Sequence, residues 1–205
     1  MAAIIISRLS GFRSEMKKYK TIYADPPWNV SLFSRVVRPQ QLPHPYPKMK
    51  LSEIKALPVN ELADEQCYLF LWVTQHWLPK AFEVIEAWGF NYHCCLTWDK
   101  TCGFTPMSFM WSTEFLLFAQ RPGKWLNLKK LGIKTLFQAK SSKHSRKPAE
   151  AYEIIEKVSY APRLELFARP HSPMFPKRTD WDVWGNEVES DVDIFQEAQC
   201  TTKPA

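Results

Sequence analysis

CYLFLWVT, at residues 67–74, is a continuous run of apolar side chains rich in β-forming residues. Such a run is typical of a strand in a parallel sheet that is covered on both faces. KTIYADPP (20–27), upstream, predicts a short buried strand that runs into a loop. PKAFEVIEAWGF (79–90), downstream, has the periodicity of an amphipathic helix, with Pro79 near its start and Gly89 at its stop.

The rest of the chain continues this alternation of strands and helices. Further strands are expected at 91–100, 112–120, 163–170 and 181–188, one more candidate strand at 131–140, and helical segments at 52–63 and 147–158. The alternation predicts an α/β domain with a mostly parallel sheet and helices on both faces. Ligands of such sheets bind at the carboxyl ends of the strands, which places the expected site around residues 25–28, 98–100 and 169–172.

We expect one domain at residues 20–188, because the 205-residue chain is long enough for a single core of ordinary size. Residues 1–19 are expected to be a lead-in, and residues 189–205 an acidic, flexible tail. Residues 29–50 are rich in proline and predict a long irregular loop. The N-terminal apolar patch lacks the features of a signal peptide, and no apolar run approaches the roughly 20 residues of a membrane helix.

The cysteines show no metal-binding pattern. None forms a Cys-x-x-Cys pair, and no histidine pair accompanies the five of them, which are Cys67, Cys94, Cys95, Cys102 and Cys200. We therefore expect no metal site and free thiols in a reducing cytoplasm.

Basic residues are concentrated in one window, from Arg121 to Pro148. It contains nine lysines and arginines and no acidic residue, although the net charge of the whole chain is only +6. A basic block in an otherwise acidic chain favours a polyanionic partner, and the alternative is a solvated basic loop without a ligand. The candidate phosphate contacts in this window are Lys129, Lys130, Lys140 and Lys143.

The sharpest chemical feature is Asp25-Pro26-Pro27-Trp28 at the end of the first expected strand. Two prolines stiffen the backbone and remove two N–H donors, so the loop offers only acceptors beside one carboxylate and one large ring. An exocyclic amino group on a planar base supplies the matching donors and a flat face for stacking on Trp28. Asp25 and the Pro26 carbonyl could each accept one N6 hydrogen of adenine, which would free the nitrogen lone pair for attack.

The sequence resembles the adenine-N6 methyltransferases that include the catalytic subunit of the eukaryotic messenger-RNA methyladenosine writer. The resemblance extends in family order from about residue 20 to residue 188. It is carried by residues 22–28, 46–49, 69–74, 88–90, 145–148, 165–171 and 184–187. It implies a Rossmann-like methyltransferase domain with permuted strand order, in which the catalytic loop precedes the main cofactor segment.

The resemblance also implies S-adenosyl-L-methionine as the cofactor. Asp25 and Lys147 match positions beside its amino group and carboxylate, and Glu165, Leu166, Phe167, Arg169, His171, Asn186 and Glu187 match positions around the rest of it. Two positions depart from the pattern: Ser172 stands where Asn is usual, and Glu187 where the writer subunit has Gln.

The substrate is expected to be nucleic acid. Tyr46 and Lys48, in the proline-rich loop, are substrate-loop candidates or plain loop anchors. The compact chain looks like bacterial or phage members, which favours DNA over RNA and a bacterial or phage-infected cytoplasm, and a homo- or heterodimer stays open. Two alternatives remain: a non-catalytic nucleic-acid-binding subunit, which the intact Asp25 and Lys147 oppose, and a small-molecule methyltransferase, which the basic window opposes.

Overall fold

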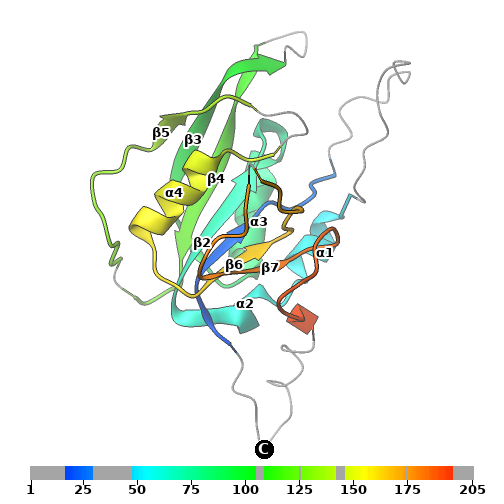
Figure 1. The fold of residues 1–205 in the computed structure, drawn as a ribbon, viewed down its shortest axis with the longest axis vertical. Coiled ribbons are helices and arrows are strands. Elements are labelled where there is room, and N and C mark those ends of the chain that lie inside the picture. Colours follow the sequence, from blue (N-terminus) through cyan, green and yellow to red (C-terminus); the bar gives the residue numbers. More distant parts are fainter. Residues whose placement is uncertain are drawn as a thin grey trace, which may run out of the picture.

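The computed structural model describes residues 17–29, 48–104, 109–124, 126–141, 146–173 and 175–195. Within them the chain forms one seven-stranded sheet in the order β5-β3-β4-β2-β1-β6-β7 (Figure 1). The strands are β1 (Tyr19–Ala24), β2 (Ala63–Val73), β3 (Asn91–Phe104), β4 (Trp111–Gln120), β5 (Leu136–Gln138), β6 (Arg163–Leu166) and β7 (Trp181–Trp184). No described helix has the length and apolar character needed to cross a membrane.

One strand runs against the others. β4 is antiparallel to both of its neighbours, β2 and β3, whereas all the other pairs in the sheet are parallel. The amino end of β4 therefore lies at the same edge of the sheet as the carboxyl ends of the other strands. The expected α/β fold with a mostly parallel sheet is confirmed, and this edge is where such a sheet binds its ligands.

Helices cover both faces of the sheet, as expected (Figure 1). One face carries α1 (Leu51–Lys55), α2 (Val59–Leu62) and α3 (Leu78–Ala87), and the other carries α4 (Ala149–Val158). A 3-10 turn, η1 (Gln75–Trp77), joins β2 to α3. The expected helical segment at 52–63 is two short helices, because Pro58 interrupts it.

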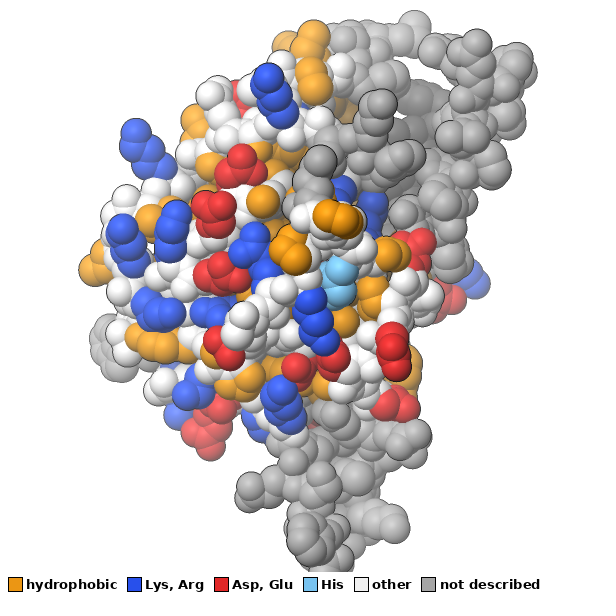
Figure 2. Space-filling view, in the orientation of Figure 1, with side chains coloured by type: hydrophobic (Ala, Val, Ile, Leu, Met, Phe, Trp, Pro, Cys, Tyr) orange, Lys and Arg blue, Asp and Glu red, His pale blue; other side chains and the backbone are white. Residues whose placement is uncertain are grey.

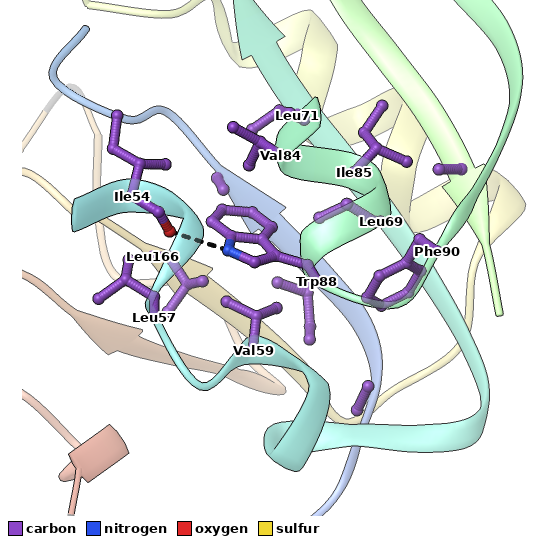
Figure 3. Packing of buried hydrophobic residues seen from close by; sticks show 14 of the residues in the cluster. Ile54, Leu57, Val59, Leu69, Leu71, Val84, Ile85, Trp88, Phe90 and Leu166 are labelled. Atoms are coloured by element: carbon purple, nitrogen blue, oxygen red, sulfur yellow. Dashed lines mark hydrogen bonds between the residues drawn. The ribbon is translucent and has the colours of Figure 1, made fainter. Parts of the chain in front are cut away.

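The core on the α3 face is built around Trp88, which is fully buried (Figure 3). Its indole N–H donates to the carbonyl of Ile54 at 2.9 Å, so α3 and α1 are joined by a hydrogen bond as well as by packing. Ala81, Val84 and Ile85 are buried on the same side of α3, which is the apolar face that its periodicity predicts. This core packs against the carboxyl end of β1.

The packed domain extends past its expected end. Ile194 is fully buried, and the Asp191 carboxylate accepts a hydrogen bond from the backbone N–H of Val183 at 2.9 Å. The same carboxylate pairs with Lys177 at 2.6 Å. Residues 189–195, expected to belong to a flexible tail, therefore dock on β7. At the other end, Tyr19 begins β1 and is fully buried, so it belongs to the domain and not to a lead-in.

Candidate active site

The Asp-Pro-Pro-Trp loop lies at the carboxyl end of β1, in the middle of the sheet between β2 and β6. Hydrogen bonds hold its backbone: the N–H of Trp28 donates to the Pro26 carbonyl at 2.8 Å, and that of Met49 donates to the Pro27 carbonyl at 3.0 Å. The Pro26 carbonyl therefore has one lone pair in use and one left for a further donor. The loop is a rigid set of acceptors, as its two prolines predict.

Four alternating charges lie beside this loop. Lys147 Nζ is 3.0 Å from Asp25 Oδ1 and 3.1 Å from Glu114 Oε2. Glu114 Oε1 in turn is 3.4 Å from Lys100 Nζ. We call these four residues the charge ladder: Asp25 directly follows β1, Lys100 is in β3, Glu114 is in β4, and Lys147 is two residues before α4. All four side chains are at most 20% exposed, so their attractions are screened much less than those of surface pairs.

The ladder keeps its inner members ionised. Burial by itself would lower the pKa of Lys147, but Asp25 and Glu114 together raise it above its ordinary value. Burial would likewise raise the pKa of Glu114, but Lys147 and then Lys100 hold it below its ordinary value. The Lys147 ammonium also lies 5.3 Å from the centre of the Trp72 ring, a further cation–π attraction.

A cavity of about 270 Å³ opens next to the ladder, between α4 and the carboxyl ends of β6 and β7. Phe167, directly after β6, has a φ of 64°, a left-handed conformation that costs a non-glycine residue roughly 1–3 kcal/mol. Such outliers cluster at binding sites, and this one ends β6 and turns the chain along the cavity wall. The lining combines opposite charges with aromatic rings: Tyr23, Asp25, Arg146, Lys147, Ala149, Tyr152, Glu165, Phe167, Arg169, His171, Phe175, Pro176, Arg178, Trp181 and Val183.

The wall of the cavity contains a buried hydrogen-bonded group. Tyr152 Oη donates to Glu165 Oε1 at 2.7 Å, and Trp72 Nε1 donates to Tyr23 Oη at 2.7 Å. The two tyrosine rings are 4.9 Å apart between their centres. Burial, with a smaller effect from Asp25, raises the pKa of Glu165 to about 7, so this carboxyl titrates in the neutral range.

Most of the expected cofactor residues meet at this cavity. Asp25, Lys147, Glu165, Phe167, Arg169 and His171 all line it. Leu166 does not: it is fully buried in the core on the α3 face (Figure 3), because neighbouring residues of a strand point to opposite faces. Asn186 and Glu187 are exposed, in the turn after β7, and are not among the lining residues.

Trp28 differs from its expected position. Its ring is only 6% exposed, its N–H donates to the Trp72 carbonyl at 2.9 Å, and it stacks on Trp77 with ring centres 5.9 Å apart and planes 22° apart. The expectation of an open stacking surface on Trp28 is therefore corrected: this ring packs in the core and holds the loop in place. The outer ring of the pair is that of the half-buried Trp77.

The lysines of the basic window that the structure describes do not lie together. The backbone N–H of Lys129 bonds to the Val158 carbonyl at the carboxyl end of α4, so Lys129 and Lys130 lie a whole helix, about 15 Å, from the Lys147 end. Lys140 follows β5 at the same edge as Asp25. Figure 2 shows that the Lys and Arg side chains of this face are interleaved with Asp and Glu side chains. Lys48 is exposed, and Tyr46 and Lys143 lie outside the described residues.

Several site residues escaped the sequence analysis. Glu114 had a visible signal, because it is the single charged residue in the apolar strand segment 112–120. Lys100 was not singled out, although it lies in the strand-end range 98–100 where the site was expected. Tyr152 and Arg178 reach the cavity from α4 and from the segment before β7, and only the packing of those segments brings them together.

The MT-A70 family matches residues 19–187. The chain is similar to the type II methyltransferase M.MunI of Mycoplasma sp, with 29% identity over 189 residues, which are 84% of this chain and 78% of that protein. It is also similar to the human N(6)-adenosine-methyltransferase catalytic subunit METTL3, with 27% identity over 193 residues, 86% of this chain but only 29% of METTL3. The Arabidopsis thaliana N(6)-adenosine-methyltransferase MT-A70-like protein is 28% identical over 186 residues, 83% of this chain and 24% of that protein.

Proposed function

This chain belongs to the MT-A70 family, with its Rossmann-like methyltransferase fold, and we propose that it transfers a methyl group from S-adenosyl-L-methionine to the N6 amino group of adenine in nucleic acid. The observation that carries the proposal is the ion pair of Asp25 with Lys147. It lies where a rigid loop of acceptors meets a cavity with a mixed-charge, aromatic lining. The acceptor loop on one side of this ion pair suits the methyl acceptor, and the cavity on the other side suits the methyl donor.

The charges fit the cofactor. The methionine part of S-adenosylmethionine carries an ammonium and a carboxylate, and Asp25 and Lys147 offer the opposite charge to each. Glu114 also contacts Lys147 and helps to keep it charged, so Lys147 retains a partner when Asp25 binds the ammonium of the cofactor. Acceptor oxygens such as that of Glu165 suit the ribose hydroxyls, and the rings of Phe167 and Phe175 suit the adenine.

The acceptor loop fits the amino group. The Asp25 carboxylate and the free lone pair of the Pro26 carbonyl can hold the two N6 hydrogens, which weakens the delocalisation of the nitrogen lone pair into the ring. When bound, S-adenosylmethionine supplies an electrophilic methyl group on a positively charged sulfur. The residues of this chain contribute orientation and electrostatic stabilisation, and Asp25 is placed to take the proton that leaves the nitrogen.

We propose DNA as the preferred polymer. Of the relatives reported above, the Mycoplasma type II methyltransferase has the highest identity, 29%, and the proposal of DNA follows this similarity. Methylation within duplex DNA requires that the adenine leave the base stack to reach Asp25. Lys147 is assigned to the cofactor, and Lys140, at the edge of the sheet that carries Asp25, is placed to contact a phosphate of the same substrate.

The test is to incubate the protein with labelled S-adenosylmethionine and matched DNA and RNA oligonucleotides, and then to identify the methylated base. Asp25→Ala is expected to lower the rate by about 10²–10³ while the protein stays folded, since it removes a charged acceptor from the site. Asp25→Asn keeps the size and one acceptor oxygen but removes the negative charge, so a smaller loss than that of Asp25→Ala is expected. Near-normal turnover by a folded Asp25→Ala protein would refute the proposal.

A further inference from the structure

Two large apolar side chains are exposed to solvent at the end of the β3–β4 hairpin. Phe109 is 83% exposed and Met110 is 60% exposed, and Phe109 is the most exposed large hydrophobic residue in the part of the chain that the structure describes. The residues of β3 on the other side of the hairpin are also exposed, but they are small or polar: Thr101, Cys102 and Gly103. Scattered single apolar residues on a surface are ordinary, whereas two adjacent ones at the end of a projecting hairpin indicate a contact surface.

The hairpin projects past the rest of the sheet at the edge where β1 ends. β2 ends opposite Phe115, so within the sheet residues 111–114 of β4 pair with β3 alone. Figure 1 shows these two strands running on beyond the end of β2. Glu114 of the charge ladder follows Phe109 by five residues, which is at most about 17 Å of extended chain, or roughly five base-pair steps of DNA. A duplex with its target adenine at Asp25 is therefore within reach of the exposed pair.

A β-bulge sets the direction of the hairpin. Four residues of β3, 100–103, lie opposite a single residue of β4. Among them Thr101 has a φ of 59°, a left-handed conformation that is strained for a β-branched residue. Its backbone N–H donates to the Asp99 carboxylate at 2.9 Å, and that carboxylate also accepts a hydrogen bond from Gln138 of β5 at 2.8 Å. Bulges beside active sites re-aim the chain, and this one is held in place from β5.

The two strands stay in close contact after the bulge. A Cβ atom on Gly103 would lie only 2.8 Å from the backbone of Ser112, so a larger residue would push the strands apart. Pairing resumes where Phe104 is opposite Trp111, and the N–H of Ser112 donates to the Met110 carbonyl at 2.9 Å. The backbone next to the exposed pair is therefore fixed, which lowers the entropy cost of a contact made there.

We infer that Phe109 and Met110 form an apolar wedge that enters the base stack of duplex DNA beside the target adenine. This inference rests on the proposed function. Taking an adenine out of a duplex breaks its pairing and stacking, and its neighbours in the strand lose a stacking partner. Phenylalanine and methionine are among the side chains that DNA-binding proteins insert between base steps, and an aromatic ring replaces part of the lost stacking.

The surroundings of the wedge suit DNA better than a protein partner. Residues 100–113 contain no acidic residue, and their one charge is that of Lys100, so no carboxylate of this segment repels a phosphate backbone. A stable protein interface needs about 800 Å² from each partner, spread over roughly 20–30 residues. Two side chains with small or polar neighbours fall far short of this, whereas a wedge needs only the side chains that it inserts.

The experiment compares substrates that differ in how firmly the target adenine is held. The DNA strand in which the methylated adenine has been located is supplied alone, in a matched duplex, and in a duplex with a mismatch at that adenine. The double variant Phe109→Ala/Met110→Ala is expected to lose roughly 10- to 100-fold in kcat/KM on the matched duplex. On the single strand it should stay within about 3-fold of wild type, with an intermediate loss on the mismatch, because less pairing and stacking has to be broken there.

Further measurements separate insertion from folding. Phe109→Tyr keeps an aromatic ring and is expected to stay close to wild type on every substrate. Tyr92→Ala removes a ring that is 44% exposed at the other end of β3, and it should show no loss that depends on the substrate. With 2-aminopurine in place of the target adenine, wild type should raise the fluorescence of the duplex on binding, and the double variant should raise it less. Calorimetric affinity for S-adenosylmethionine should be the same in both proteins.

The outcomes are distinct. No loss on the matched duplex, or an equal loss on duplex and single strand, refutes the inference and leaves the proposed function standing. A double variant that sediments as a monomer where wild type is a dimer shows that the pair joins two copies of the chain, and this also refutes the inference. So does a wild-type protein that methylates adenine in single strands alone. A wild-type protein that methylates no adenine refutes the proposed function, and the inference with it.

Discussion

Replacing Lys147 by methionine tests the charge ladder most directly. Methionine keeps an unbranched chain of similar length but removes the ammonium, so both carboxylates that Lys147 contacts, those of Asp25 and Glu114, lose their partner at this position. Asp25 then has no ion-pair partner among the described residues, and Glu114 keeps only Lys100, at 3.4 Å. The two carboxylates also repel one another once the cation between them is gone.

The expected magnitude follows from this burial. Removing one member of a buried ion pair typically costs about 3–5 kcal/mol, because an uncompensated charge stays in the protein. Some relief comes from Lys100 and from protonation, so we expect the lower value, about 3 kcal/mol. For a domain of this size that is a fall in Tm of about 6–12 °C at neutral pH.

The pH dependence has a definite sign. A carboxyl group whose folded pKa lies below its ordinary value stabilises the fold above that ordinary value, and its contribution is lost as the pH falls through the folded pKa. The ordinary value for Glu114 is 4.5. The gap between wild type and Lys147→Met is therefore expected to be largest at neutral pH and to shrink below about 4.5.

The assay is urea and thermal unfolding of both proteins from pH 4 to pH 8, with Lys100→Met as the matched control. That variant leaves Lys147 between its two carboxylates, so no buried carboxylate is left without a cation, and we expect a smaller loss of about 1 kcal/mol. Calorimetry should also show weakened binding of S-adenosylmethionine to Lys147→Met alone. A Tm within 2 °C of wild type, or a loss no larger than that of the control, would refute the account of the ladder.

Three further predictions follow from the site. Burial raises the folded pKa of Glu165 to about 7, so its contribution to the free energy of unfolding is full below about pH 4.5 and is lost as the pH rises to about 7. In urea unfolding, wild type should therefore lose stability between pH 5 and 7, and Glu165→Gln should not show this loss. Asn186→Ala should weaken S-adenosylmethionine binding about 10-fold without changing the target sequence, and calorimetry with unchanged affinity would exclude this residue from the cofactor site. Two lysine pairs are to be changed to alanine and compared: Lys140 with Lys143, and Lys129 with Lys130. In fluorescence anisotropy, changing the first pair should lower the slope of log affinity against log salt concentration by roughly 0.7–0.9 per lost phosphate contact, and changing the second pair should lower it less. Equal slopes in the two variants would show that the distance of a lysine from the Asp25 edge does not decide whether it contacts the nucleic acid.

The sequence alone was enough to predict most elements of the fold and the place of Asp25 at the end of a buried strand. Hydrophobic periodicity located β1, β2, β3, β4 and α3 to within a few residues, because each of these elements buries a face whose spacing is set by its own backbone geometry. Asp25 at the end of a buried strand followed from the same reasoning. The strand expected at 163–170 ends at Leu166, because Phe167 has a left-handed backbone conformation. A pattern of hydrophobicity does not show such a conformation, so the expected strand was too long.

Only the tertiary structure decided which residues meet. Lys100, Glu114 and Lys147 lie far from Asp25 in the chain. Glu114 reaches it because β4 runs antiparallel and brings its amino end to the edge of the sheet where β1 ends. Strand direction depends on the connections and packing of the whole sheet, and no local pattern contains it. The same holds for Trp28, whose ring the sequence left free to stack on a base and whose burial depends on Trp72 and Trp77. Chain-local chemistry determined the residue types of the site, and long-range packing determined their partners.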